Sequence, residues 1–91
     1  MKYLSLLTIV NPEINRQSRP DHLRYISELY NQGKVFMAGP YEDGSGGLVI
    51  YECASVQEAN ELASQDPAVT SGARTVVVHS WSPLNLPVHP V

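Results

Sequence analysis

The chain of 91 residues contains a single cysteine, Cys53, which excludes an internal disulfide and suits a reducing compartment. No apolar stretch approaches the roughly 18 residues that a membrane-spanning helix needs. Basic side chains are also few, with six Lys and Arg against nine Asp and Glu. The resulting net charge of −3 gives no electrostatic reason to expect nucleic acid or a membrane surface as partner. We therefore expect a cytoplasmic protein.

Signatures of metal and cofactor binding are missing as well. No spacing of Cys, His, Asp and Glu resembles a set of metal ligands, so no metal is expected. No glycine-rich dinucleotide fingerprint is present, so no cofactor is expected either. The partner that these exclusions leave is a small-molecule substrate.

What the chain does contain is a pattern of four strands. Each predicted strand is an apolar stretch bounded by turn-forming residues. The glycine-rich segment 41–47, between the two middle strands, is typical of a hairpin turn. The predicted strands are residues 3–10, 34–40, 48–53 and 73–81.

Two helices are predicted between these strands. The first follows a polar loop over residues 11–17, with Ser18 as its cap and Pro20 in its first turn. The second begins at a capping box that starts at Ser55, and Asp66 followed by proline breaks it.

This order of elements predicts an α+β domain with the ferredoxin-like βαββαβ topology. Its antiparallel sheet would have the strand order 4-1-3-2, with both helices on one face. We expect one domain over residues 1–81 and a Pro-rich tail over residues 82–91. A domain this small buries only about 60–65% of its unfolded surface, which favours a homodimer or higher homo-oligomer. RNA binding is set aside, because the central strands lack paired aromatics and the chain is acidic.

Two ionisable residues are predicted to face the sheet at one end of this domain. Helical spacing places His22 within the apolar stripe of the first helix, and Asp66 within that of the second if that helix continues so far. The topology brings these helix ends together. A His/Asp pair in a partly dry recess is suited to proton transfer, with His22 as general base and Asp66 as the residue that orients it. Alternatively, Asp66 caps a following turn, a role that does not exclude catalysis.

Other polar residues are weaker candidates for binding a substrate. The two arginines could each meet an anionic group, although surface solvation explains them equally well. Backbone N–H groups of the hairpin could hold substrate oxygens, although a hairpin needs glycines in any case. The substrate-binding candidates are Arg19, Ser45, Gly46, Ser71 and Arg74.

Several short motifs carry a family resemblance over residues 3–81. The motifs are Arg19-Pro20-Asp21-His22-Leu23, Gly33-Lys34-Val35, Ala38-Gly39-Pro40, Asp66-Pro67 and Gly72. With these motifs the chain resembles the YCII-related (YciI-like) family. The resemblance implies a dimeric ferredoxin-like protein, the dimeric α/β-barrel, whose His/Asp site corresponds to His22 and Asp66.

The same resemblance suggests a reaction. The enzymatic representative of the family is similar to a dehydrochlorinase that acts on a chlorinated hydroxyhydroquinone in chloroaromatic breakdown. By analogy, the chain would be a cofactor-free lyase that eliminates HCl from a chlorinated, hydroxylated aromatic compound. Two alternatives stay open. One is an isomerase like the related muconolactone isomerases, and the other is a non-catalytic module that binds a small ligand or a protein.

Overall fold

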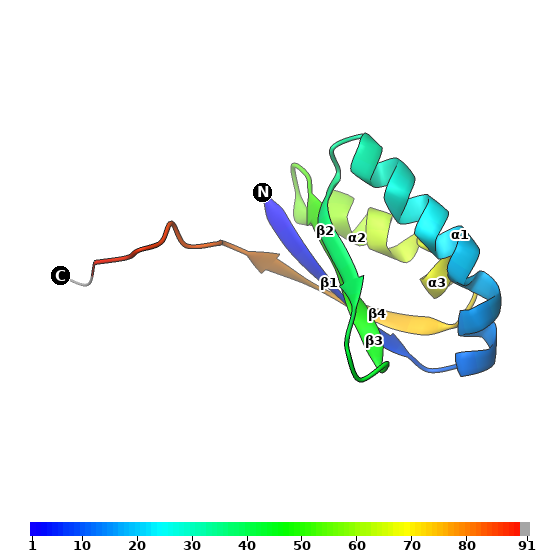
Figure 1. Cartoon of the computed structure of the whole chain (residues 1–91). Coiled ribbons are helices and arrows are strands. Elements are labelled where there is room, and N and C mark those ends of the chain that lie inside the picture. The colour runs from blue at the N-terminus through cyan, green and yellow to red at the C-terminus, as the bar shows by residue number, and fades with distance from the viewer. Residues whose placement is uncertain (90–91) are drawn as a thin grey trace.

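A single antiparallel sheet carries all three helices on one face in the computed structural model of the chain, which describes residues 1–89 (Figure 1). The strand order is β2-β3-β1-β4, and every neighbouring pair is antiparallel. This is the predicted order 4-1-3-2 read from the opposite edge, so the predicted ferredoxin-like α+β topology is confirmed. The strands are β1 (Lys2–Ile9), β2 (Val35–Pro40), β3 (Gly46–Glu52) and β4 (Arg74–Trp81).

The core lies between the helices and one face of the sheet. Along the central strand β1, alternate residues are buried: Tyr3, Ser5 and Leu7 are each at most 2% exposed, whereas the residues between them are only partly buried. This period of two gives the sheet one face toward the helices and one face away from them. The core cluster consists of Tyr3, Leu7, Leu29, Val35, Val49, Tyr51, Ala59 and Ala63.

The first helix, α1 (Pro12–Asn31), begins about two turns earlier than predicted. The predicted loop over residues 11–17 is therefore wrong. Asn11 is the N-cap, its Oδ1 accepts a hydrogen bond from the Ile14 N–H at 3.1 Å, and Pro12 takes the first helical position. The chain thus has two successive helix-start signals, and the helix uses the first.

Pro20 consequently lies inside α1 rather than in its first turn. An interior proline removes one backbone hydrogen bond and costs about 3 kcal/mol, which is why local reasoning favours a helix start at Ser18. The additional turns make tertiary contacts that outweigh this preference. Ser18 is buried, and Asn15 accepts a hydrogen bond from Arg74 of β4 at 2.7 Å.

The second helix, α2 (Val56–Ser64), begins at the predicted capping box, in which Ser55 Oγ accepts a hydrogen bond from the Glu58 N–H at 3.2 Å. It ends before Asp66, so Asp66 is not in its last turn. A short third helix, α3 (Pro67–Thr70), begins there instead, with Asp66 as its N-cap.

The opposite face of the sheet has no helix over it among the described residues (Figure 1). Large apolar side chains are exposed on this open face. Val77 and Trp81 of β4 are 56% and 42% exposed, and they pair with Leu6 and Lys2 of β1, whose neighbours in the strand point into the core. A sheet of this kind buries its apolar surface on one side only.

Beyond β4 the chain runs away from the sheet, and residues 82–89 contain no helix or strand (Figure 1). Residues 90 and 91 of the predicted tail lie outside the described residues. Within the described part of the chain, no helix is both long enough and apolar enough to cross a membrane.

Candidate active site

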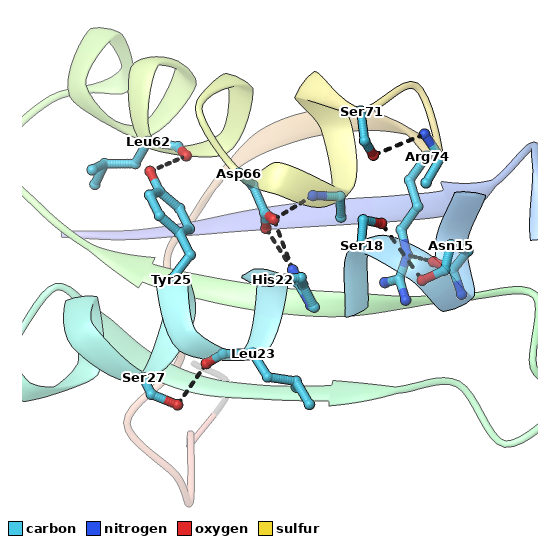
Figure 2. Close-up of polar contacts among 12 residues, drawn as sticks. Asn15, Ser18, His22, Leu23, Tyr25, Ser27, Leu62, Asp66, Ser71 and Arg74 are labelled. Carbon is cyan, nitrogen blue, oxygen red and sulfur yellow. Dashed lines mark hydrogen bonds and ion pairs between the residues drawn. The ribbon is translucent and has the colours of Figure 1, made fainter. Parts of the chain in front are cut away.

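A buried hydrogen-bonded pair joins α1 to the start of α3. Nδ1 of His22 lies 2.7 and 2.9 Å from the two carboxylate oxygens of Asp66 (Figure 2). His22 is the eleventh of the 20 residues of α1, so it lies in the middle of the helix and not in its first turn. The two residues are 6% and 1% exposed. The structure therefore brings His22 and Asp66 together, whereas their catalytic role remains a prediction.

The position of Asp66 is fixed by its second role as a helix cap. Its Oδ1 also accepts a hydrogen bond from the backbone N–H of Ala68 at 2.9 Å. The carboxylate thus satisfies an otherwise unpaired N–H of α3 and the imidazole of α1 at the same time. The capping role and the pairing role proposed from the sequence belong to one geometry.

This geometry also sets the tautomer of His22. An ionised carboxylate only accepts hydrogen bonds, so Nδ1 carries the proton in the neutral imidazole. Nε2 then holds the lone pair, and it makes no hydrogen bond to any residue within 1–89. A nitrogen base with an oriented ring and a free lone pair is what general-base catalysis requires.

Two tyrosines lie close to the buried carboxylate. Burial, reinforced by the negative charge of Asp66, raises the pKa of both Tyr25 and Tyr51 above the usual phenol value. The Tyr25 hydroxyl donates a hydrogen bond to the Leu62 carbonyl at 2.7 Å, which ties α1 to α2 next to the pair (Figure 2). Both phenols therefore stay protonated and add no further negative charge at neutral pH.

A cavity of about 160 Å³ lies between α1 and the sheet, and His22 is part of its wall. Its polar side chains are His22, Arg19 and Arg74. Asp66 is not among the lining residues, so it supports His22 from behind. The remaining lining is apolar or glycine: Leu7, Leu23, Ile26, Ala38, Gly39, Pro40, Gly47, Leu48 and Val49.

Arg74 reaches into this cavity from the first position of β4. Its Nε donates a hydrogen bond to Oδ1 of Asn15 at 2.7 Å (Figure 2), and the residue is only 6% exposed. Burial lowers the pKa of the Arg74 guanidinium, the charge of Asp66 opposes this change, and the charge of Arg19 adds to it. An arginine retains its charge under such conditions, so the cavity has a fixed positive wall.

Three of the predicted substrate-binding residues do not line the cavity. The hydroxyl and N–H of Ser45 both bond to Asp43 within the hairpin, and Ser71 Oγ accepts a hydrogen bond from the Ala73 N–H. Gly46 is buried because β1 and β3 approach closely there, and a side chain would overlap the Leu7 carbonyl oxygen. Its neighbour Gly47 lines the cavity in its place.

Sequence reasoning missed Asn15, which it assigned to a loop. The signal that could have found it is the Asn-Pro-Glu start at residues 11–13, since a helix beginning there places Asn15 one turn before Arg19 on the same helix. Within residues 1–89, no group of three His, Cys, Asp or Glu side chains lies close enough together to hold a metal ion.

A second and larger groove, of about 500 Å³, runs between α1 and the edge strand β2. Its described lining residues include no His, Asp, Glu, Lys, Arg or Cys, so the groove offers no side chain of the kind that serves as a general base at neutral pH. The residues suited to chemistry gather in the smaller cavity.

Two solved structures resemble this fold. One is the 5-chloro-2-hydroxyhydroquinone dehydrochlorinase (TftG) from Burkholderia phenoliruptrix AC1100 in complex with 2,5-dihydroxybenzoquinone, with a TM-score of 0.77 and 21% sequence identity over 90% of this chain and 94% of that chain. The other is a muconolactone isomerase, with a TM-score of 0.75 and 14% identity over 100% of this chain and 98% of that chain. Both similar structures are enzymes, and at this level of identity the likeness shows the shared fold alone.

Sequence comparison gives the family. The uncharacterized protein YjpA of Bacillus subtilis (strain 168) is 29% identical over 76 residues, which are 84% of this chain and 89% of that protein. The family model of the YCII-related domain matches residues 1–82, nearly the whole chain. The chain therefore belongs to the YCII-related family.

Proposed function

We propose that the chain is a small enzyme that works without a cofactor, in which His22 removes a proton from a small oxygenated ring compound and Asp66 orients the imidazole. One observation carries this proposal. The carboxylate of Asp66 holds Nδ1 of His22 at 2.7 and 2.9 Å, and His22 lines a cavity whose other walls are largely apolar. A buried pair of this kind fixes ring orientation and stabilises the imidazolium that forms when the base takes a proton.

The reaction we propose is elimination of HCl from a chlorinated, hydroxylated aromatic compound. His22 takes a proton from one hydroxyl, and the ring carbon that carries chlorine accepts a proton, which gives the keto form. Loss of a proton from a second hydroxyl then expels chloride from that carbon, which keeps its new C–H bond. Two hydroxyl protons are lost and one C–H bond is formed, so the net loss is HCl and the ring reaches the quinone level with no external oxidant. The likeness to the dehydrochlorinase TftG supports this choice as an analogy of fold.

The test uses 5-chloro-2-hydroxyhydroquinone as substrate and measures free chloride. We expect His22→Gln to lower the rate of chloride release by about a hundredfold to ten-thousandfold, the usual contribution of a positioned base. Asp66→Asn is expected to lower it as well, because the imidazole loses its orienting carboxylate. The matched control is His89→Gln, because His89 is exposed in the tail and far along the chain from the cavity.

Chloride release that survives His22→Gln unchanged would contradict the proposal. If the wild type releases no chloride, the proposed elimination is wrong. The remaining proposed reaction is then proton transfer between carbons, as in an isomerase. That second reaction is detected as uptake of solvent deuterium into muconolactone. Binding of the ring compounds with neither reaction would favour the non-catalytic module.

The proposal includes a homodimer formed through the open face of the sheet. Val77 and Trp81 from β4, with Phe36 and Met37 from β2, leave an apolar surface at 42–60% exposure. Surfaces of this kind on small domains are commonly covered by a partner. A second copy would cover that face and leave the cavity on the helix side accessible.

A further inference from the structure

Two of the six basic side chains have no acidic partner in the part of the chain that the structure describes, and both line the cavity. Among residues 1–89, neither Arg19 nor Arg74 has a carboxylate within 4.0 Å. Each of the other four is paired at the surface. These pairs are Lys2 with Glu52, Arg16 with Glu13, Arg24 with Asp21 and Lys34 with Glu58.

Arg74 is the more unusual of the two, because this charged residue is only 6% exposed. Its Nε is occupied by Oδ1 of Asn15 at 2.7 Å. The two terminal nitrogens make no hydrogen bond to any residue that the structure describes. A buried cation normally has its donors satisfied, since an unpaired charge is costly in such a place. The two terminal nitrogens of Arg74 are not fully buried, so a ligand in the cavity can reach their unused donors.

The charge of the cavity is opposite to that of the whole chain. The chain has a net charge of −3, yet the lining of the cavity contains two guanidinium groups and an imidazole and no carboxylate. Asp66 makes no ion pair with either arginine within residues 1–89, because its oxygens already bind His22 and the Ala68 N–H, although its charge favours the charged form of Arg74. Arg19 and Arg74 repel each other across the cavity, and an anion placed between them would relieve this repulsion.

The size of the cavity limits the anion. About 160 Å³ is close to the roughly 150 Å³ of an engineered protein cavity that binds benzene. Leu7 and Val49 of the sheet and Ile26 of α1 supply apolar surfaces on either side. A single six-membered ring fits these dimensions, with its faces on the apolar walls and its edge toward the charged groups.

We infer that the cavity binds a small planar ring that carries an ionised oxygen, such as an enolate, a phenolate or a carboxylate, and that Arg74 and Arg19 hold this oxygen beside Nε2 of His22. Asn15 is a positioning residue, because it fixes Nε of Arg74 and leaves the terminal nitrogens for the ligand. The inference rests on the proposed function and names the charge of its substrate.

The experiment measures binding by calorimetry, without turnover. The anionic probes are 2,5-dihydroxybenzoquinone, whose hydroxyls are acidic enough to ionise at neutral pH, and benzoate. The neutral counterparts are 2,5-dimethoxybenzoquinone and benzamide. We expect at least one anionic probe to bind at least tenfold more tightly than its neutral counterpart, and to bind more weakly as salt is raised. Inorganic phosphate, which has charge but no ring, is expected to compete poorly.

Two variants test the residues. Arg74→Gln removes the charge, and Asn15→Asp places a carboxylate next to the intact Arg74 and occupies it as an ion pair. Each is expected to abolish the preference for the anionic probe. The control for Asn15→Asp is Asn60→Asp, which adds the same charge to an exposed position on α2 and should leave the preference unchanged.

The inference is overturned if no anionic ring binds better than its neutral counterpart, if phosphate binds as tightly as the rings, or if Asn15→Asp behaves like Asn60→Asp. These results concern binding alone. Loss of chloride release in His22→Gln with no preference for anions would retain the proposed base and remove the anion site. A preference for anions with no effect of His22→Gln on chloride release would retain the anion site and remove the proposed base.

Discussion

The carboxylate of Asp66 faces Nδ1 of His22 with both of its oxygens, at 2.7 and 2.9 Å, although 44 positions separate the two residues in the chain. One of these oxygens, Oδ1, also accepts the hydrogen bond from the Ala68 N–H. The cap of α3 therefore fixes which oxygen of the carboxylate lies where. The same cap would determine how the amide group of an Asp66→Asn variant is oriented.

Asp66→Asn is expected to shift the tautomer of His22. The Ala68 N–H requires an acceptor, so the amide oxygen takes the position of Oδ1, where it also lies near Nδ1, and the NH₂ group takes the position of Oδ2, 2.9 Å from Nδ1. A donor at that position opposes a proton on Nδ1, so a larger fraction of the neutral imidazole carries its proton on Nε2, the nitrogen that serves as base in the wild type. Nitrogen NMR of the neutral imidazole distinguishes the two forms.

The matched control for this measurement is Asp43→Asn, which changes an exposed carboxylate of the hairpin and should leave the His22 spectrum unchanged. If His22 has the same tautomer populations in Asp66→Asn and in the wild type, the second carboxylate oxygen does not help to hold the proton on Nδ1. The geometric account of the base would then be wrong.

Because Tyr51 is buried, we predict that the protein loses stability at alkaline pH. Burial, with a smaller contribution from the charge of Asp66, raises the pKa of Tyr51 in the folded state. The unfolded chain therefore loses this proton first. Stability is complete below the unfolded-state value of about 10 and falls as the pH rises above it, by at most about 1.4 kcal/mol per pH unit for one group.

Tyr51→Phe should reduce this alkaline loss, which is measured as the free energy of unfolding in urea at neutral pH and above pH 10. At neutral pH the substitution is expected to be neutral or slightly stabilising, because the Tyr51 hydroxyl has no hydrogen-bond partner in the described part of the chain. Tyr30→Phe, at a position 61% exposed, is the control. Identical pH profiles for wild type and Tyr51→Phe would refute the argument.

The strand order and the proximity of His22 to Asp66 can both be predicted from the sequence, because both follow from the order of the strands and helices. The succession of strands and helices allows few topologies, and one of them brings the two residues to the same end of the sheet. His22 also lies at a helical spacing that faces the core, and the structure buries it. Helical spacing also places Leu23 and Tyr30 in the apolar stripe of the first helix, but they are 41% and 61% exposed. The stripe is centred on His22 and Leu29 instead.

The pairing of Asn15 with Arg74 could not be predicted from local signals, and for the start of α1 two local signals compete. Pro20 favours a start at Ser18, and Asn11-Pro12-Glu13 favours the earlier one. Tertiary contacts of the additional turns, among them the contact of Asn15 with Arg74 of β4, 59 positions along the chain, favour the earlier start. The hydrogen-bond partner of the Ser45 hydroxyl could not be predicted from the sequence either. Its hydroxyl is bound by Asp43 two residues away, and a glycine-rich hairpin does not reveal whether its polar groups face inward or satisfy the turn.

Gly46 is expected to tolerate no side chain. A Cβ at this position would overlap the Leu7 carbonyl oxygen, which belongs to the backbone of the central strand and cannot move without breaking the pairing of β1 with β3. We expect Gly46→Ala to lower the free energy of unfolding by at least about 2 kcal/mol.

Gly39→Ala is the matched control for this prediction. It lies on the neighbouring strand β2, its backbone does not need a glycine, and a Cβ there would meet nothing within 4 Å. Its effect on stability should stay within about 0.5 kcal/mol. Equal stabilities for the two variants would show that β1 and β3 can separate at this point without cost.

Val77 tests the proposed dimer through the open face of the sheet. It is 56% exposed and lies opposite Leu6 near the middle of β1, so a partner that covers this face must contact it. Val77→Asp would bury a charge in that contact, at a cost that a small interface cannot absorb. We expect the wild type to have the mass of a dimer by light scattering and Val77→Asp to have the mass of a monomer with native circular dichroism.

The control is Val56→Asp, on α2 at 39% exposure and on the other side of the domain, which should remain dimeric. A dimer that survives Val77→Asp would mean that the two copies associate through another surface, and a wild-type monomer would remove the dimer altogether.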